Sequence, residues 1–315
     1  MGLSLSKIDG AINQAILAIS TKEGYSNAFL SFWLRKEKDR ITATFLQGGQ
    51  GNLSGEIVKN LIVPVPSQLE QTKIGNFFNQ LDGIITLHQR KLETLKKLKR
   101  TLLQKMFPKK GQLKPELRFP GFTNDWEQRK FYDCFKLLRN NSLARAELAK
   151  IGKIRNIHYG DVLINYPEVL NISTATVPFI AESRVNSISK DSYLENGDIV
   201  IADTAEDESV GKTTEIQGIT DHKIVSGLHT IPCRPLVNFS PNFLGFLLNS
   251  PSYHDQLKPL IQGIKVSSIS KKALGETRVC FAKDLDEQAQ IGGFFNGLEM
   301  LITLHQRNSP YQNQL

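Results

Sequence analysis

The stretch Ile74-Gly-Asn-Phe-Phe-Asn-Gln-Leu-Asp-Gly-Ile-Ile-Thr-Leu-His-Gln-Arg90 decides how this chain is organised, because it occurs twice. The second copy is Ile291-Gly-Gly-Phe-Phe-Asn-Gly-Leu-Glu-Met-Leu-Ile-Thr-Leu-His-Gln-Arg307, displaced by 217 residues. Between 67–90 and 284–307, 14 of 24 positions are identical. Residue usage near one in twenty predicts roughly one or two identities by chance. The match therefore indicates an internal duplication.

Both copies are predicted to be helices with the same start. Ser67-x-x-Glu70 and Asp284-x-x-Glu287 have the capping-box pattern, in which an N-cap oxygen and a carboxylate satisfy free backbone amides. In the first copy, apolar residues recur every three or four positions from Ile74 to Met106, which is typical of a coiled-coil seam. About 39 helical residues would extend roughly 58 Å, so we expect a rigid spacer.

The second helix is expected to cover only part of the first, because its pattern ends at Arg307. The final turns of the first helix, from Lys91 to Met106, then lack an intramolecular partner. Such a leucine row should recruit another chain or reduce solubility. Its basic residues fit either a solvated coiled-coil face or a stripe that faces phosphates. The candidate interface residues are Leu92, Leu95, Leu98, Leu102 and Met106.

The duplication also suggests how the chain divides into domains. The expected fold class is α+β. Phe29–Leu34 weakly matches Phe243–Leu248, and Leu46–Gly48 matches Ile261–Gly263, whereas about 100 residues from Phe119 onward have no earlier counterpart. We therefore expect Met1 to begin inside a domain. Short β-branched runs predict strands at 154–157, 161–165, 198–202, 212–216, 223–225 and 229–233, with helices at 241–249 and 252–260. The predicted segments are a partial first domain at 1–66, a long helix at 67–107, a linker at 108–125, a complete second domain at 126–283, a shorter helix at 284–307 and a tail at 308–315.

Composition sets the broad class of the protein. The chain has 315 residues, 39 basic against 31 acidic, and a formal charge of +8, which favours nucleic acid among possible partners. Its 40% hydrophobic content is that of a folded protein. No apolar run is long enough to cross a membrane, and no secretory signal is visible, so we expect a cytoplasmic protein without membrane contact. Three widely spaced cysteines predict neither a disulfide framework nor a zinc site.

Catalytic motifs are weak in this sequence. Val210-Gly-Lys-Thr213 resembles the end of a phosphate-binding loop, but Glu206 stands where that loop needs its first glycine. The neighbouring acidic residues are more simply explained as solvated surface groups than as metal ligands. We therefore predict a protein that is not an enzyme and binds no metal.

Two further stretches carry a family resemblance. Val63-Pro-Val-Pro-Ser-Gln-Leu-Glu-Gln71, leading into the repeated helix, and the restart at Leu117-Arg-Phe-Pro-Gly-Phe-x-x-x-Trp126 resemble the specificity (S) subunit of bacterial type I restriction-modification systems. The resemblance implies two target-recognition domains held apart by two antiparallel helices, each domain reading half of a split double-stranded DNA site. It also implies modification subunits that methylate adenine with S-adenosylmethionine, and restriction subunits that use ATP and Mg. No cofactor is then expected on this chain.

Under this hypothesis the second domain reads the major groove through polar residues on its loops. Lysines that precede the last strand are expected to contact phosphates. The leucine row would bind a modification subunit, a second copy of the chain or a complementing S fragment. The alternatives are a truncated, non-functional recombination product and a coiled-coil scaffold without DNA binding. The candidate base readers are Arg155, Asn156, His158, Thr204, Lys212, Lys265, Ser267 and Ser268, and the candidate phosphate ligands are Lys271 and Lys272.

Overall fold

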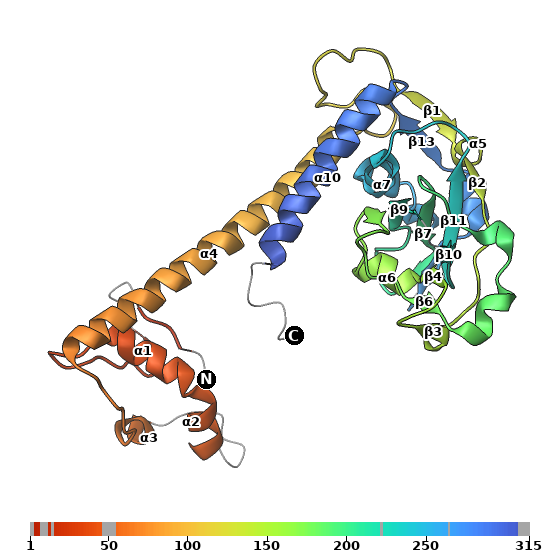
Figure 1. Ribbon diagram of the computed structural model, residues 1–315. Coiled ribbons are helices and arrows are strands. Elements are labelled where there is room, and N and C mark those ends of the chain that lie inside the picture. The colour runs from red at the N-terminus through yellow and green to blue at the C-terminus, as the bar shows by residue number, and fades with distance from the viewer. Residues whose placement is uncertain are drawn as a thin grey trace. The chain divides into compact units, whose positions relative to one another are not determined.

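The computed structural model describes residues 3–6, 12–13, 16–45, 55–220, 223–263 and 265–307. It divides into two units, of which the first ends at Lys91 and the second begins at Leu92 (Figure 1). The predicted tail 308–315 and the weak match at Leu46–Gly48 lie outside the described residues.

The long helix predicted from the repeat is confirmed as α4 (Gln68–Lys105), with 38 residues. One half of its predicted capping box is present, because the Ser67 hydroxyl accepts a hydrogen bond from the Glu70 amide at 3.4 Å. The second copy forms α10 (Leu285–Arg307), where the Asp284 carboxylate accepts from the amide of Asp286 at 2.8 Å. Asp284 also accepts from the Glu287 amide at 3.4 Å, so the two copies of the repeat share the same N-cap bond.

The first unit is helical in its described part, with α1 (Asn27–Lys36), α2 (Lys38–Phe45) and α3 (Gly55–Lys59) before α4. Helix α1 packs on the start of α4, where the rings of Phe32 and Phe78 lie 5.1 Å apart. Gly75 permits this approach, because a Cβ there would lie 2.9 Å from the Cβ of Ala28. The weakly repeated Phe29–Leu34 segment thus forms a helix against the strongly repeated one.

The second unit combines helices and sheets, which confirms the α+β fold class. A five-stranded sheet has the order β2-β11-β7-β9-β5, and a four-stranded sheet has the order β10-β4-β6-β3. The strands of the first sheet are β2 (Phe135–Leu137), β5 (Val169–Asn171), β7 (Ile199–Ala202), β9 (Thr213–Gln217) and β11 (Thr230–Pro235). Those of the second are β3 (Leu148–Ala149), β4 (Ile154–Ile157), β6 (Phe179–Ile180) and β10 (Lys223–Ser226). Two further pairs are β1 (Glu127–Lys130) with β13 (Arg278–Phe281), and β8 (Thr204–Ala205) with β12 (Ser267–Ser268).

Five of the six predicted strands occupy their expected places, and the one at 161–165 is wrong. That segment is α6 (Tyr159–Ile164), whose N-cap is His158. The imidazole Nδ1 of His158 accepts a hydrogen bond from the Gly160 amide at 3.2 Å, which starts the helix. The remaining short helices are α5 (Phe131–Cys134), α7 (Phe243–Asn249), α8 (Pro251–His254) and α9 (Lys271–Gly275).

The largest buried cluster of the second unit includes residues of α7, α10 and the end of α4. Phe243, Phe246 and Phe295 are fully buried, and Phe107 stacks on Phe295 at 6.0 Å. Trp126 meets the edge of Phe107 at the same separation. This aromatic cluster fastens the repeated helix to the sheet domain.

The expectation of an unpaired leucine row at the end of α4 is wrong. Helix α10 runs antiparallel beside this end (Figure 1), so Leu92 packs on Leu298 and Ile302 while Phe107 meets Phe295. The chain turns back after its second unit, and the return helix therefore covers the end of α4. The predicted interface residues divide accordingly: Leu92 and Met106 are buried, Leu95 and Leu102 are half-buried, and Leu98 is exposed.

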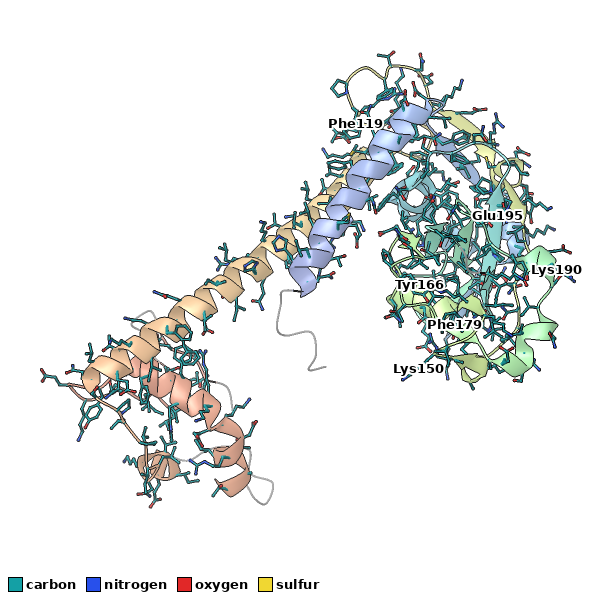
Figure 2. The ribbon with its side chains drawn as sticks, viewed as in Figure 1. Phe119, Lys150, Tyr166, Phe179, Lys190 and Glu195 are labelled. Carbon is teal, nitrogen blue, oxygen red and sulfur yellow. The ribbon has the colours of Figure 1, made fainter. Side chains whose placement is uncertain are left out.

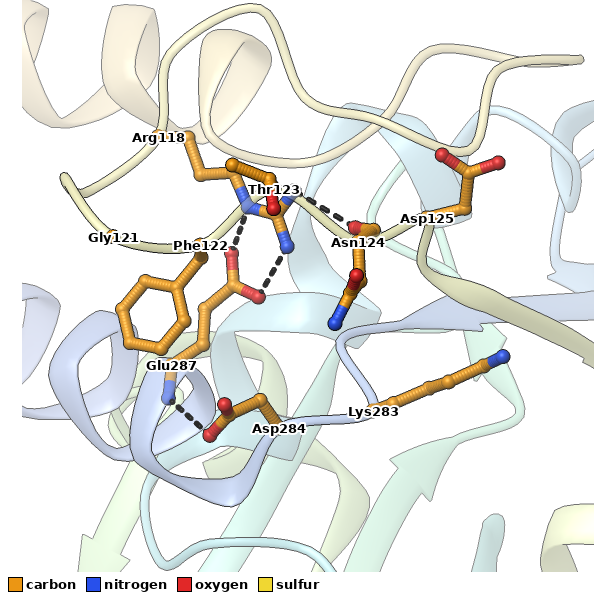
Figure 3. A pocket seen from close by; sticks show the side chains of 9 residues that line it. All are labelled: Arg118, Gly121, Phe122, Thr123, Asn124, Asp125, Lys283, Asp284 and Glu287. Carbon is orange, nitrogen blue, oxygen red and sulfur yellow. Dashed lines mark hydrogen bonds and ion pairs between the residues drawn. The ribbon is translucent and has the colours of Figure 1, made fainter.

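Half of the predicted capping box of α10 is also wrong. The Glu287 side chain bonds to another residue and not to the backbone amide of the N-cap. Its buried carboxylate binds Arg118 through two bonds of 2.6 and 2.7 Å (Figure 3). The indole of Trp126 donates to the same carboxylate at 3.3 Å. Arg118 and Trp126 are the charged and aromatic ends of the restart motif, so this motif locks the linker onto the repeated helix. The linker and helix start together line a cleft of about 280 Å³.

Candidate nucleic-acid interface

Polar side chains from four segments gather where β7 ends. We call this set the polar rim: Tyr159, Asp203, Thr204, His229, Lys265, Ser267 and Ser268. Three segments are tied together by backbone, because the Asp203 amide donates to the His229 carbonyl at 3.1 Å and the Ile269 amide donates to the Asp203 carbonyl at 2.9 Å. Pairing of β8 with β12 sets Thr204 opposite Ser268.

Lys265 lies two residues before β12, in the segment between Gln262 and Ser268. Gln262 and Ser268 exchange backbone hydrogen bonds of 2.8 and 2.9 Å, which closes the turn between them. Gly263 has a φ of +114°, and a Cβ there would lie 2.0 Å from the carbonyl oxygen of Val266. Only glycine fits this turn without displacing the backbone. Lys265, two residues after Gly263, is exposed.

A second turn, between β10 and β11, presents His229. Its base is clamped by a 2.6 Å hydrogen bond between the hydroxyls of Ser226 and Thr230, and by the Gly227 amide donating to Ile157 at 2.8 Å. His229 itself has a φ of +54°, a left-handed conformation that is uncommon for residues other than glycine. Such conformations persist where the surroundings enforce them, and they cluster at functional sites.

Tyr159 links the His229 turn to the start of α6. Its ring lies edge-on to His229 at 5.3 Å and packs on the ring of His158 at 4.7 Å. Burial lowers the pKa of His158, and the nearby Arg145 guanidinium lowers it further. His158 therefore acts as a neutral, buried support that orients Tyr159, and it is not itself presented to a ligand.

Four of the eight predicted base readers lie together in the polar rim: Thr204, Lys265, Ser267 and Ser268. The structure contradicts the prediction for the other four, whose side chains bond within the domain: Arg155, Asn156, His158 and Lys212. Asn156 is fully buried and accepts a 2.7 Å hydrogen bond from the side chain of Asn141. Arg155 donates to the Ile172 carbonyl at 2.5 Å and lies 5.5 Å from the ring of Phe179, a residue labelled in Figure 2.

Lys212 is held inward as well, because its ammonium donates to the Leu163 carbonyl at 2.8 Å. Burial lowers the pKa of this lysine. Arg155, Asn156 and Lys212 were expected on loops that connect strands, but their side chains bond inside the domain.

Charge is unevenly distributed around the rim. Glu206, Asp207 and Glu208 are exposed directly after β8, where they repel phosphate. On the other side, Lys271 and Lys272 are exposed in the first turn of α9, three and four residues after Ser268. Phosphate contacts are therefore favoured on the β12 and α9 side, which agrees with the predicted role of these lysines and leaves that role a prediction.

Tyr159 and His229 were not predicted as site residues from the sequence. Neither belongs to a motif, since their neighbours in the rim come from segments up to about 110 residues away. The only local signal for His229 was its position after Ser226-Gly227 between two β-branched runs. Within the described residues, no group of three or more His, Cys, Asp or Glu side chains is arranged to hold a metal ion. No helix in this part of the chain is both long and apolar enough to cross a membrane.

A family model and curated proteins are similar to this chain in sequence. Residues 5–97 match the family described as "Type I restriction modification DNA specificity domain". The type I restriction enzyme MjaVIII specificity subunit of Methanocaldococcus jannaschii is 23% identical over 203 residues, covering 61% of this chain and 45% of the relative. The putative MjaX specificity subunit of the same organism is 24% identical, covering 56% and 40%. The matched regions thus span less than half the length of these curated relatives.

Solved structures share the fold. The type I restriction-modification S subunit from M. genitalium superposes with a TM-score of 0.53 at 17% identity, covering 90% of this chain and 68% of the other. A structure described as underlying complex assembly and conformational transition of the type I R-M system gives 0.54 at 14% identity, covering 91% and 67%. The chain therefore shares its fold with these two structures.

Proposed function

We propose that this relative of type I restriction-modification specificity subunits is a non-catalytic DNA-recognition subunit, and that its second unit reads one half of a bipartite double-stranded site. The polar rim is the surface that would enter the major groove. The duplicated architecture suits a split target, because a repeated protein module matches a repeated arrangement of half-sites. Action on cellular DNA would place the protein in the cytoplasm.

One observation carries this proposal: four of the predicted base readers, drawn from two distant segments, converge on one rim with His229 and Tyr159. Hydroxyl, imidazole and ammonium groups can each read base edges or contact phosphates. Hydrogen bonds close the bases of the two turns, so the backbone that carries these groups is ordered before DNA binds. Ordered groups lose less entropy on binding than mobile ones do.

We further propose that modification subunits dock on the paired helices. Helix α10 exposes Met300, Leu301 and Leu304, with 67, 50 and 54% of each residue's surface accessible. Leu98 of α4 is 45% exposed. Apolar groups in this number are typical of contact surfaces. S-adenosylmethionine would be bound by these partners, and ATP and Mg by restriction subunits.

The test is selection of bound sequences from a library of 40-base-pair duplexes whose central positions are randomised, with the full chain as bait. The proposal predicts enrichment of a defined element of a few base pairs. Lys271→Ala and Lys272→Ala should weaken binding to all duplexes alike and lower the salt slope by about one unit each. Lack of any enrichment, together with binding unaffected by salt, would support the scaffold alternative instead.

A further inference from the structure

The geometry of the polar rim assigns His229 a specific task, which rests on the DNA-reading function proposed above. We propose that His229 is a specificity-determining residue whose Nε2 accepts a hydrogen bond from a base amino group in the major groove. The amino groups available there are N6 of adenine and N4 of cytosine.

The neighbours of His229 determine which of its two nitrogens carries the proton. The hydroxyl of Thr204 donates to the Asp203 carboxylate at 2.7 Å. A hydroxyl has one hydrogen, so towards His229 the Thr204 oxygen can only accept. That oxygen lies 3.4 Å from Nδ1 of His229. The proton must therefore be on Nδ1 for the two side chains to interact favourably.

Asp203 reinforces this arrangement. Its carboxylate lies 3.6 Å from the same Nδ1, and a negative group at that distance favours a proton on the facing nitrogen. In the neutral ring Nε2 is then an acceptor, with no hydrogen to donate. The sequence Asp203-Thr204 thus determines the hydrogen-bonding character of a histidine that follows 25 residues later.

The His229 ring is held at the surface of the domain with Nε2 available to a ligand. His229 is exposed, with 46% of its side-chain surface accessible, although it lies in a turn whose flanking residues are buried or half-buried. Nδ1 is directed to Thr204 and Asp203, and the edge-on contact with Tyr159 limits rotation of the ring. Nε2 is the remaining polar atom of the side chain. An acceptor is consequently held at the rim without a hydrogen-bond partner of its own among the residues that the structure describes.

An acceptor at Nε2 of His229 restricts which base it can contact. Guanine offers only acceptors, N7 and O6, on its major-groove edge, and thymine offers the acceptor O4. Neither can donate to Nε2. Adenine and cytosine each present an amino donor, so a rim built around this tautomer prefers one of these two bases at the position it faces.

The experiment begins with the duplex enriched by the full chain. In that duplex each adenine is replaced in turn by purine, and each cytosine by 2-pyrimidinone, which removes a single amino group. Affinities are measured at pH 8.5, where histidine is ordinarily the neutral imidazole. The comparison variants are His229→Asn and His229→Gln. Asparagine tolerates a positive φ and can retain the inner bond to Thr204, but it lacks a group at the position of Nε2.

We expect one amino-group removal to weaken binding of the natural chain about tenfold and that of His229→Asn less than twofold. His229→Gln, which retains an acceptor further from the backbone, should keep most of the discrimination. Equal losses in the natural chain and His229→Asn for every replaced base would overturn the assignment. Failure to enrich any sequence at all would instead reject the DNA-reading function on which the assignment rests.

Discussion

Phe78 and Phe295 occupy the same position in the two copies of the repeat, yet Phe78 is 40% exposed and Phe295 is fully buried. Each ring contacts the equivalent residue of the preceding helix, with Phe32 5.1 Å from Phe78 and Phe246 5.3 Å from Phe295. The two rings differ in exposure because different residues cover the face that points away from the preceding helix. In the second unit Phe107 stacks on the repeated phenylalanine.

Other contacts of the repeat are conserved between the two units. Gln71 accepts from the Ser26 amide at 3.1 Å and donates to the Pro66 carbonyl at 2.8 Å. Gln288 makes the corresponding bonds to Ser240 and Ala282, at 2.9 and 2.7 Å. The motif therefore encodes a local joint between two helices. How deeply that joint is buried depends on residues outside the motif.

The largest expected effect comes from truncating the two phenylalanines. Phe295→Ala should destabilise the second unit by about 3–5 kcal/mol, because it opens a cavity in an aromatic core. Phe78→Ala should cost the first unit about 1 kcal/mol, since its ring is already partly solvated. Hydrogen exchange monitored by mass spectrometry reports each unit separately. Equal losses in both units would show that the cover on Phe295 has no energetic consequence.

The glutamates at the start of the two helices offer a second matched pair. Glu287→Gln removes the partner of Arg118 in a buried ion pair and should cost about 3 kcal/mol. Glu70 is exposed, so Glu70→Gln should change stability by less than about 0.5 kcal/mol. Chemical denaturation of the second unit, followed by the fluorescence of Trp126 in a Trp33→Phe background, measures the first effect. A silent Glu287→Gln would mean that the restart motif does not lock the linker.

A third pair lies within α4 itself. Leu92 is 8% exposed beside Leu298, whereas Leu98 is 45% exposed. Leu92→Ala should destabilise the helix pair by about 2 kcal/mol, and Leu98→Ala should be nearly neutral. The same exchange measurement over α4 and α10 checks this. The reverse ranking would contradict the antiparallel packing described above.

A smaller, pH-dependent effect is expected from the second unit alone. Burial lowers the pKa of His254, whose Nε2 lies 2.9 Å from the Val210 carbonyl. The unfolded chain takes up this proton more readily, so stability is present above pH about 6.5 and is lost as the pH falls through the folded-state pKa. The slope from this one group is at most about 1.4 kcal/mol per pH unit. His254→Gln should flatten the acid side of the stability curve, and an unchanged curve would rule out this contribution.

The parts of the molecule that sequence reasoning found are those with local signals. The period of α4 and the β-branched runs of β4 and β10 depend on neighbouring residues, so they could be predicted. The α6 start could not be, because it relies on an imidazole as N-cap. The pairing of α10 with the end of α4 depends on the chain reversing its direction across a whole domain.

The candidate site follows the same division. Thr204 and Ser268 were found because polar residues at strand ends are recognisable in sequence. Arg155 has the right chemistry, but in the fold it faces a carbonyl and an aromatic ring inside the domain. His229 could be recognised only in the structure, where backbone hydrogen bonds join its turn to Asp203, and Asp203 to Ile269. Long-range convergence of this kind leaves little trace in a single sequence.

The most direct test of the DNA-reading rim compares one added charge at two places in the second unit. Ser268 lies in the polar rim, and Thr220 follows β9 at the end of the sheet where β7 begins, away from Asp203; both are exposed. The affinity of the full chain for its enriched duplex should fall at least about tenfold with Ser268→Glu and less than twofold with Thr220→Glu, because a carboxylate in the groove repels phosphates and loses base contacts. Equal effects of the two substitutions, or a larger effect of Thr220→Glu, would contradict the assignment of the rim as the DNA-reading surface.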